Sequence, residues 1–548
     1  MEYLNDWTVP EGMSGDPNHL RFRPSHVRTS ARGCPQRLAM KVRPGLAPVE
    51  PVPRQRARPN TYALAPVEKV LDRRAFHGLD DEAALAFWKG SEARRHHNAH
   101  ARWVEHALVR YLRAEKEIDS GLRADGTTVE AVSHQWARTR SLTVGGIPIR
   151  HEETVTGRRF DGPGIRELRL LRHGSVEGRA SDAAEVGLAA GVVAGARRVL
   201  GGAWDTGGYR LGAHRPVERI RVVEIGLLDG SHHVLFDDTG PAAHAAYTDD
   251  AEAHLWRSAG GGEYLPGDDC GACPLLGRCP AVMSVPGLLG MPEPGVHRKT
   301  WSVSTARSYE RCPAPVHLGD LRLPRNKESE ETPATTRGRA VHSWIETQHR
   351  RTPVRACSPH DADGEHGVPE RGRLPANEAA LAVQMAGDHT LTCPLATPSP
   401  VLDVHPERTV VVFDPTADVL VIAKVDLLYR TEAGWALRET KTARRADEGG
   451  LLEHHPQMAL GVLLSAHGAL PGGPGGCRVE LERLTVTGPV LKEFAVGDSV
   501  IVARARRAIA SLVKGWLKDT AYKEKPGRPC ATCSFARWCP GGERKADR

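Results

Sequence analysis

The stretch DVLVIAKVDLLYRTEAGWALRETKTAR, residues 418–444, decides the fold. Its β-branched apolar run, the turn residues that follow and a second apolar run predict a β-hairpin. With the turn centred just after Glu432, Asp426 on the first strand lies opposite Glu439 on the second. Because side chains alternate along a strand, Glu439 and Lys441 share one face. The hairpin therefore places two carboxylates and one ammonium group together.

These three side chains predict a catalytic metal site. Two close carboxylates repel one another and are costly at a partly buried site unless a cation neutralises them. Their oxygens suit Mg²⁺ or Mn²⁺, which would activate a bound water and polarise a phosphodiester. Lys441 would orient the nucleophile or offset developing charge. The alternative is an ordinary salt pair on a sheet surface, which contributes little.

Two predicted helices flank the hairpin. The segment TTRGRAVHSWIETQHR (335–350) predicts a helix that is capped by one of its two leading threonines and carries His342. The segment HHPQMALGVLLSAHGAL (454–470) predicts a helix opened by its proline, with Gln457 in the first turn.

Eight of the eleven cysteines fall into two sets of one plus three, with the same C-x2-C-x5-C spacing in each triplet. The first set is Cys34, Cys270, Cys273 and Cys279, and the second is Cys312, Cys530, Cys533 and Cys539. We expect no secretory signal, so the spacing favours metal binding over disulfides. Each site would close a long loop and convert metal-binding free energy into folding free energy. Spacing alone leaves zinc and an iron–sulfur cluster open.

Other segments repeat in the same order as the cysteines. AAEVGLAAGVVAGA (183–196) echoes HPQMALGVLLSAHGA (455–469), and a β-rich segment precedes each triplet at a similar distance. Since 548 residues exceed one hydrophobic core, we expect two domains that arose by duplication. The expected division is a flexible N-terminus at 1–20, a first domain at 21–283, a Pro/Gly-rich linker at 284–299 and a second domain at 300–548, with a polar insert at 355–377.

The second half resembles the PD-(D/E)xK nuclease superfamily, specifically the RecB-like branch with a four-cysteine iron–sulfur cluster, such as the AddB subunit nuclease and the CRISPR-adaptation exonucleases. The family order is a cysteine, a helix with a histidine, Asp, E-x-K, a Q-x-x-x-Y helix and the C-x2-C-x5-C triplet. Residues 300–540 hold these elements in that order, although Gly461 replaces the family's tyrosine.

The resemblance implies an α/β fold of two tandem restriction-endonuclease-like domains, each with a mixed central sheet flanked by helices and closed by a four-cysteine cluster. It implies that His342, Asp426, Glu439 and the carbonyl of Thr440 bind the catalytic Mg²⁺ or Mn²⁺. Lys441 would be catalytic, and Gln457 would place the DNA strand. It also favours [4Fe–4S] over zinc, which makes two clusters in the chain.

Composition and charge agree with a nucleic-acid partner without requiring one. The net charge is +7, and the stretch between Arg21 and Arg58 is rich in arginine, from which we select Arg28, Arg32 and Arg37 as DNA-binding candidates. The alternative is a solvated basic face. The sequence contains no apolar run of membrane-spanning length, so we expect a cytoplasmic protein that does not enter a membrane.

The first half is expected to be a degenerate copy that keeps its cluster. Glu167 and Arg169 are aligned there with Glu439 and Lys441, and arginine does not replace a compact ammonium group. We therefore predict a metal-dependent DNA nuclease, an exonuclease or a processor of single strands and ends, with the first half binding DNA or a partner. Because no P-loop pattern is present, a motor would come from a separate helicase or another repair or defence protein. The alternative is an inactive nucleic-acid-binding scaffold stapled by zinc or iron–sulfur.

Overall fold

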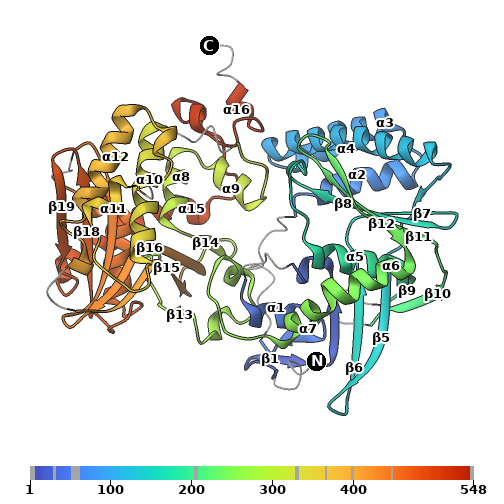
Figure 1. Ribbon diagram of the computed structural model, residues 1–548, viewed down its shortest axis with the longest axis horizontal. Coiled ribbons are helices and arrows are strands. Elements are labelled where there is room, and N and C mark those ends of the chain that lie inside the picture. Colours follow the sequence, from blue (N-terminus) through green and yellow to red (C-terminus); the bar gives the residue numbers. More distant parts are fainter. Residues whose placement is uncertain are drawn as a thin grey trace.

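The computed structural model describes residues 7–28, 33–50, 62–202, 208–326, 332–364, 367–396, 400–445 and 449–543. The two halves of the chain lie side by side, and the last described helix, α16 (Pro540–Glu543), returns toward the helices of the first half (Figure 1). Among the described residues, no helix combines the length and the apolar character that crossing a membrane requires.

The second half is built on a mixed seven-stranded sheet. Its strand order is β13-β15-β16-β17-β18-β19, with β14 pairing β16. The strands are β13 (Met283–Ser284), β14 (Lys299–Trp301), β15 (Val401–Asp414), β16 (Val419–Thr431), β17 (Gly434–Thr442), β18 (Cys477–Thr485) and β19 (Gly488–Phe494). In the β16–β17 hairpin, Thr431 lies opposite Gly434 and Leu427 opposite Arg438. This register confirms the predicted hairpin, because Asp426 and Glu439 come next on the two strands.

Helices cover both faces of this sheet. On one face, α14 (Pro456–Ala466) and α15 (Ser499–Lys518) pack with Leu437 and Val479 in one apolar core. Helix α14 is buried on nearly all sides, which its run of apolar residues explains. On the other face lie α10 (Pro333–His349), α11 (Pro359–Asp363) and α12 (Ala376–His389). Helix α10 is capped by Thr332, so it begins before the two threonines that were expected to cap it.

The first half contains two five-stranded sheets, in the orders β10-β9-β5-β6-β2 and β12-β11-β8-β7-β4, and a small pair of β1 and β3. Its strands are β1 (Met13–Gly15), β2 (His19–Phe22), β3 (Leu46–Pro48), β4 (Glu130–Ala131), β5 (Trp136–Val144), β6 (Ile147–Thr154), β7 (Arg158–Gly162), β8 (Ile165–Arg172), β9 (Arg197–Gly201), β10 (Arg210–His214), β11 (Arg219–Gly226) and β12 (His232–Thr239). Its main helices are α1 (Pro35–Lys41), α2 (Ala65–Phe76), α3 (Asp81–Phe87), α4 (Asn98–Ala124), α5 (Ala183–Gly195), α6 (Gly240–Ala246) and α7 (Glu252–Gly260).

The strand pattern β7-β8-β11-β12 repeats the pattern β16-β17-β18-β19. In each, an antiparallel hairpin is followed by a helix, a parallel strand and an antiparallel strand, although in the first half β9 and β10, which belong to the other sheet, lie between the helix and the parallel strand. Both hairpins close on a two-residue turn, so Ile165, the first residue of β8, corresponds to Gly434, the first residue of β17. Counting five residues onward along each strand, Leu170 corresponds to Glu439.

The alignment of Glu167 with Glu439 was therefore wrong. Glu167 and Arg169 point toward α4, where Arg169 pairs with Asp119, whereas Leu168 and Leu170 point toward α5. Because side chains alternate along a strand, a shift of one residue moves a side chain to the other face, and the echo of short motifs did not fix that register. The residues in the places of Glu439 and Lys441 are Leu170 and Arg172.

The two halves share packing near their junction. Leu318 of α9 (Ala314–Asp320) and Phe535 and Trp538 of the C-terminal segment lie in the same apolar core as Trp103 of α4. Within the expected linker 284–299, Leu288 and Leu289 are fully buried in the core of the second half. Within 1–20, where a flexible terminus was expected, the described residues include β1 and the start of β2.

Candidate active site

The predicted catalytic side chains meet where β16 and β17 separate. The backbone N–H of Thr440 donates to Asp426 Oδ2 at 2.8 Å, and the backbone N–H of Asp426 lies 3.4 Å from Glu439 Oε2. Lys441 Nζ donates to Glu439 Oε1 at 2.9 Å and to the carbonyl of Thr440 at 3.1 Å. His342, on α10, places Nδ1 3.6 Å from Asp426 Oδ2. The structure thus brings together the four expected metal ligands and Lys441.

The ionisable side chains of this cluster carry more negative than positive charge when both carboxyl groups are ionised. Glu439 is 4% exposed, and burial raises the pKa of its carboxyl to about 7, with Asp426 adding to the rise and Lys441 opposing it. Burial works against the ammonium of Lys441, but Glu439 and Asp426 outweigh it and raise the pKa of Lys441. Burial lowers the pKa of His342, which favours the neutral imidazole that binds metals. Two carboxylates with one ammonium group leave an excess negative charge, which a divalent cation could offset.

Gln457 lies near this cluster on the wall of one large cleft. The cleft has a volume of about 1270 Å³ and is lined by Glu439 and Gln457 of the second half and by Tyr62 and His173 of the first half. Gly461 also lines it, and a Cβ at that position would touch Val479 and Leu437. The family's tyrosine therefore has no counterpart in this chain at Gly461.

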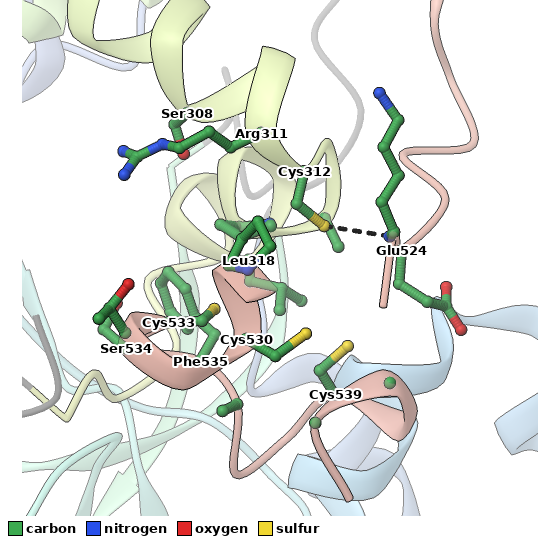
Figure 2. A pocket seen from close by; sticks show the side chains of 18 of the residues that line it. Ser308, Arg311, Cys312, Leu318, Glu524, Cys530, Cys533, Ser534, Phe535 and Cys539 are labelled. Atoms are coloured by element: carbon green, nitrogen blue, oxygen red, sulfur yellow. Dashed lines mark hydrogen bonds between the residues drawn. The ribbon is translucent and has the colours of Figure 1, made fainter. Parts of the chain in front are cut away.

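The second cysteine set surrounds a separate cavity. Cys312, at the end of α8 (Val303–Arg311), faces Cys530, Cys533 and Cys539 of the C-terminal segment across a space of about 310 Å³ (Figure 2). The backbone N–H of Lys525 lies 3.2 Å from the Cys312 sulfur, where it can stabilise a thiolate. The first set, Cys34, Cys270, Cys273 and Cys279, lines a smaller hollow, and the N–H of Gly267 lies 3.3 Å from the Cys270 sulfur.

The three arginines selected as DNA-binding candidates do not share one environment. Arg28 donates two hydrogen bonds to Glu185, at 2.8 and 2.6 Å, so its charge is already matched within the fold. Arg37 lies 3.3 Å from Asp269 and lines the large cleft, and Arg32 falls outside the described residues.

Sequence reasoning missed two arginines on the cleft wall. Arg322 and Arg325 follow α9, are exposed, and have no ion pair among the described residues. Both occur in the segment LRLPRNKE, where two arginines three residues apart were the available signal.

A buried His/Cys group that could bind a metal was also missed. It comprises His349, Cys357, His389 and Cys393, which lie outside both predicted cysteine sets. The available signal was that Cys357 and Cys393 remained unassigned and that each follows a histidine, in the patterns H-x7-C and H-x3-C.

Comparison with known proteins identifies the domain that contains the acidic cluster. Residues 300–540 match the family model described as the PD-(D/E)XK nuclease superfamily. These residues form one PD-(D/E)XK domain. Members of this superfamily are typically nucleases that hydrolyse phosphodiester bonds and usually use divalent metals, so the PD-(D/E)XK match indicates a metal-dependent nuclease fold. The matched range lies in the second half only.

Two further comparisons add little to the PD-(D/E)XK assignment. A solved structure described as "Crystal structure of SSO0001" is 15% identical, with 44% of this chain and 87% of that chain covered, at a TM-score of 0.22. That score is too low to carry an argument about the fold. No curated protein matches the chain.

Proposed function

We propose that the PD-(D/E)XK domain is a Mg²⁺- or Mn²⁺-dependent DNA nuclease that acts on single strands or ends. One observation carries the proposal: Asp426, Glu439 and Lys441 converge, with His342, at a cleft large enough for a nucleic-acid strand. A salt pair on the sheet surface does not account for this arrangement, because Glu439 is almost fully buried and shares one ammonium with a second carboxylate.

The donor set fits a hard divalent cation. Two carboxylates, an imidazole nitrogen and the carbonyl of Thr440 would hold it, and it would supply an activated water and a polarised phosphate. Lys441, fixed by Glu439 and the Thr440 carbonyl, would point its remaining N–H toward the attacking water or the developing negative charge. Gln457, on the same cleft wall, would orient the scissile phosphate.

The cleft supports a strand of DNA as the substrate. Arg322 and Arg325 stand on its wall, and no carboxylate among the described residues forms an ion pair with either, so we expect their charge to attract phosphates. Tyr62 and His173 bring the first half to the same wall, where their rings can stack on unpaired bases. The first half would thus contribute to DNA binding without chemistry.

The eight cysteines are proposed to hold two [4Fe–4S] clusters. A tetrahedral zinc ion with bonds of about 2.3 Å would bring thiolates to within about 4 Å of one another. Among the described residues, only the group of His349, Cys357, His389 and Cys393 has its ligand atoms gathered within 4.8 Å. The wider spacing of both cysteine sets supports a larger inorganic group, which would close each half near its chain ends.

A cleavage assay tests the nuclease proposal. Purified full-length protein is incubated with end-labelled linear single- and double-stranded DNA, in EDTA and with Mg²⁺ or Mn²⁺ added back. Cleavage is expected only with added metal, and Asp426→Ala and Glu439→Ala should each remove nearly all turnover. Val486→Ala, at an exposed turn outside the cleft, is the matched control. Metal-independent cleavage, or full activity of either active-site variant, would contradict the proposal. DNA binding without cleavage would favour the alternative function, an inactive nucleic-acid-binding scaffold.

A further inference from the structure

Four buried side chains of the types that bind metals converge beside the C-terminal ends of α10 and α12. His349 ends α10, Cys357 follows in the segment before α11, His389 ends α12, and Cys393 lies just beyond it. Their exposed fractions are 3%, 7%, 0% and 3%, respectively. One ligand atom from each lies within 4.8 Å of the other three.

The distances match those of a tetrahedral zinc site. His349 Nε2 lies 3.3 Å from His389 Nε2 and 3.7 Å from Cys393 Sγ. Tetrahedral zinc, with bonds of about 2.0 Å to nitrogen and about 2.3 Å to sulfur, separates two nitrogens by about 3.3 Å and a nitrogen from a sulfur by about 3.6 Å. A hydrogen-bonded cluster would not need all four atoms to meet at one point.

The hydrogen bonds around His389 fix which of its nitrogens is free for a metal. His389 Nδ1 lies 2.9 Å from Oε1 of Glu482, a fully buried carboxylate on β18. Glu482 therefore holds the proton on Nδ1 and leaves the Nε2 lone pair facing His349 and the thiols. A carboxylate behind a histidine in this way is the usual outer partner of a zinc ligand.

The same carboxylate connects the group to the catalytic strand. Glu482 Oε2 accepts a hydrogen bond from the Thr440 hydroxyl at 2.8 Å, and the backbone N–H of Thr440 holds Asp426. The second connection is α10 itself, because His342 lies seven residues, or about two helical turns, before His349. Both connections end at residues of the acidic cluster.

We propose that His349, Cys357, His389 and Cys393 bind a structural zinc ion that fixes α10 and the inner strand β17 behind the catalytic site. On binding, the two thiols release their protons to solvent, so two thiolates and Zn²⁺ form a neutral centre in the interior. Through Cys357, the ion fastens the insert 355–377 to the sheet and holds His342 and Thr440 in position. These two residues are held by the zinc centre from the side of the sheet away from the cleft.

Metal analysis of the full-length protein tests this site independently of nuclease activity. Protein is purified under reducing conditions from zinc-supplemented cells, and zinc, iron and sulfide are measured per chain. Cys357→Ser and Cys393→Ser should each contain one zinc ion fewer than the wild type, with iron and sulfide unchanged. Cys477→Ser, which alters an equally buried thiol on β18 outside all three groups, should keep the full zinc content.

A conservative variant and a visible absorption spectrum of the cobalt-substituted protein test the site even if the cysteine-to-serine substitutions impair folding. Cys393→His retains a four-ligand zinc set and should restore the zinc that Cys393→Ser loses. Cobalt-substituted wild type should show the intense visible bands of tetrahedral cobalt with sulfur ligands, and these bands should be absent from Cys357→Ser. Unchanged zinc content in both serine variants, wild-type protein without zinc, or a native Cys357–Cys393 disulfide in peptide maps would overturn the proposal.

Discussion

Replacement of Lys441 by methionine separates catalysis from metal binding. Its Nζ atom is surrounded by three oxygens, those of Glu439 at 2.9 Å, the Thr440 carbonyl at 3.1 Å and Asp426 at 3.7 Å. Lys441 is not itself a proposed metal ligand, and its removal leaves all three oxygens free to bind the cation, so Lys441→Met should still bind Mn²⁺. The substitution removes one preorganised positive donor from the reacting centre.

The expected loss in turnover follows from the value of one such donor. Removing a single preorganised donor costs about 3 kcal/mol of transition-state stabilisation, or about 10²- to 10³-fold in kcat. Folding stability should change much less, because the pKa of Glu439 is already about 7 and protonation of this carboxyl relieves the unpaired charge in the metal-free protein. Lys441→Arg should not restore the rate, since the planar guanidinium does not fit the place of a compact ammonium.

Single-turnover cleavage of end-labelled DNA with saturating Mg²⁺ measures the rate, and calorimetric titration with Mn²⁺ measures metal affinity. Lys492→Met, at an exposed position of β19 in the same sheet, serves as the control and should leave both unchanged. A kcat for Lys441→Met within a few-fold of wild type, with intact metal binding, would refute the assigned role of Lys441.

Three further predictions concern DNA binding, the clusters and acid stability. The double variant Arg322→Ala/Arg325→Ala should raise KM, leave kcat nearly constant and flatten the salt dependence of DNA binding. The control Arg507→Ala, at an exposed position of α15, should change neither KM nor the salt dependence. An unchanged KM in the double variant would exclude these arginines from the binding surface. Cys533→Ala should lose about half of the iron and sulfide measured in anaerobically prepared protein and lower Tm by several degrees; retention of both would argue against a cluster there. Despite burial, hydrogen bonds from His19, Tyr209 and Arg21 lower the pKa of Glu152 to about 2, so its stabilising contribution is present above the ordinary pKa of about 4.5 and is lost as the pH falls toward 2. Glu152→Gln should therefore reduce the slope of unfolding free energy against pH in that window, and an unchanged slope would rule out this contribution.

The active-site hairpin could be predicted because its determinants are local. The two-residue turn and the alternation of side chains set the register, and the register places Asp426 beside Glu439. The positions of His342 and Gln457 on helices followed from periodicity and from the proline that opens α14. These elements depend on neighbours in sequence, so the chain pattern was sufficient.

The partners of single charged residues could not be predicted in the same way. Arg28 meets Glu185 across 157 residues, and His349 meets His389 only after α10 and α12 pack together. The segment Arg21–Arg58 looks uniformly basic in the sequence, but folding pairs two of its described arginines, Arg21 and Arg28, with the buried carboxylates of Glu152 and Glu185. Composition therefore overstated the free positive charge of the first half and missed Arg322 and Arg325.

The charges at the two comparable sheet positions explain why only one of them is suited to a divalent cation. In the second half, Asp426 and Glu439 face the single ammonium of Lys441, which leaves the site with an excess of negative charge. In the first half, Leu170 and Arg172 stand in the places of Glu439 and Lys441, and the nearby carboxylates Glu185 and Glu224 are matched by three arginines, Arg28, Arg172 and Arg179. A divalent cation there would displace or repel guanidinium groups that already satisfy both acids, and no carboxylate replaces that of Glu439. The same strand arrangement thus forms a self-neutralised ion network in one half. In the other half it forms an acidic site with an excess negative charge that either a proton on Glu439 or a bound cation can offset.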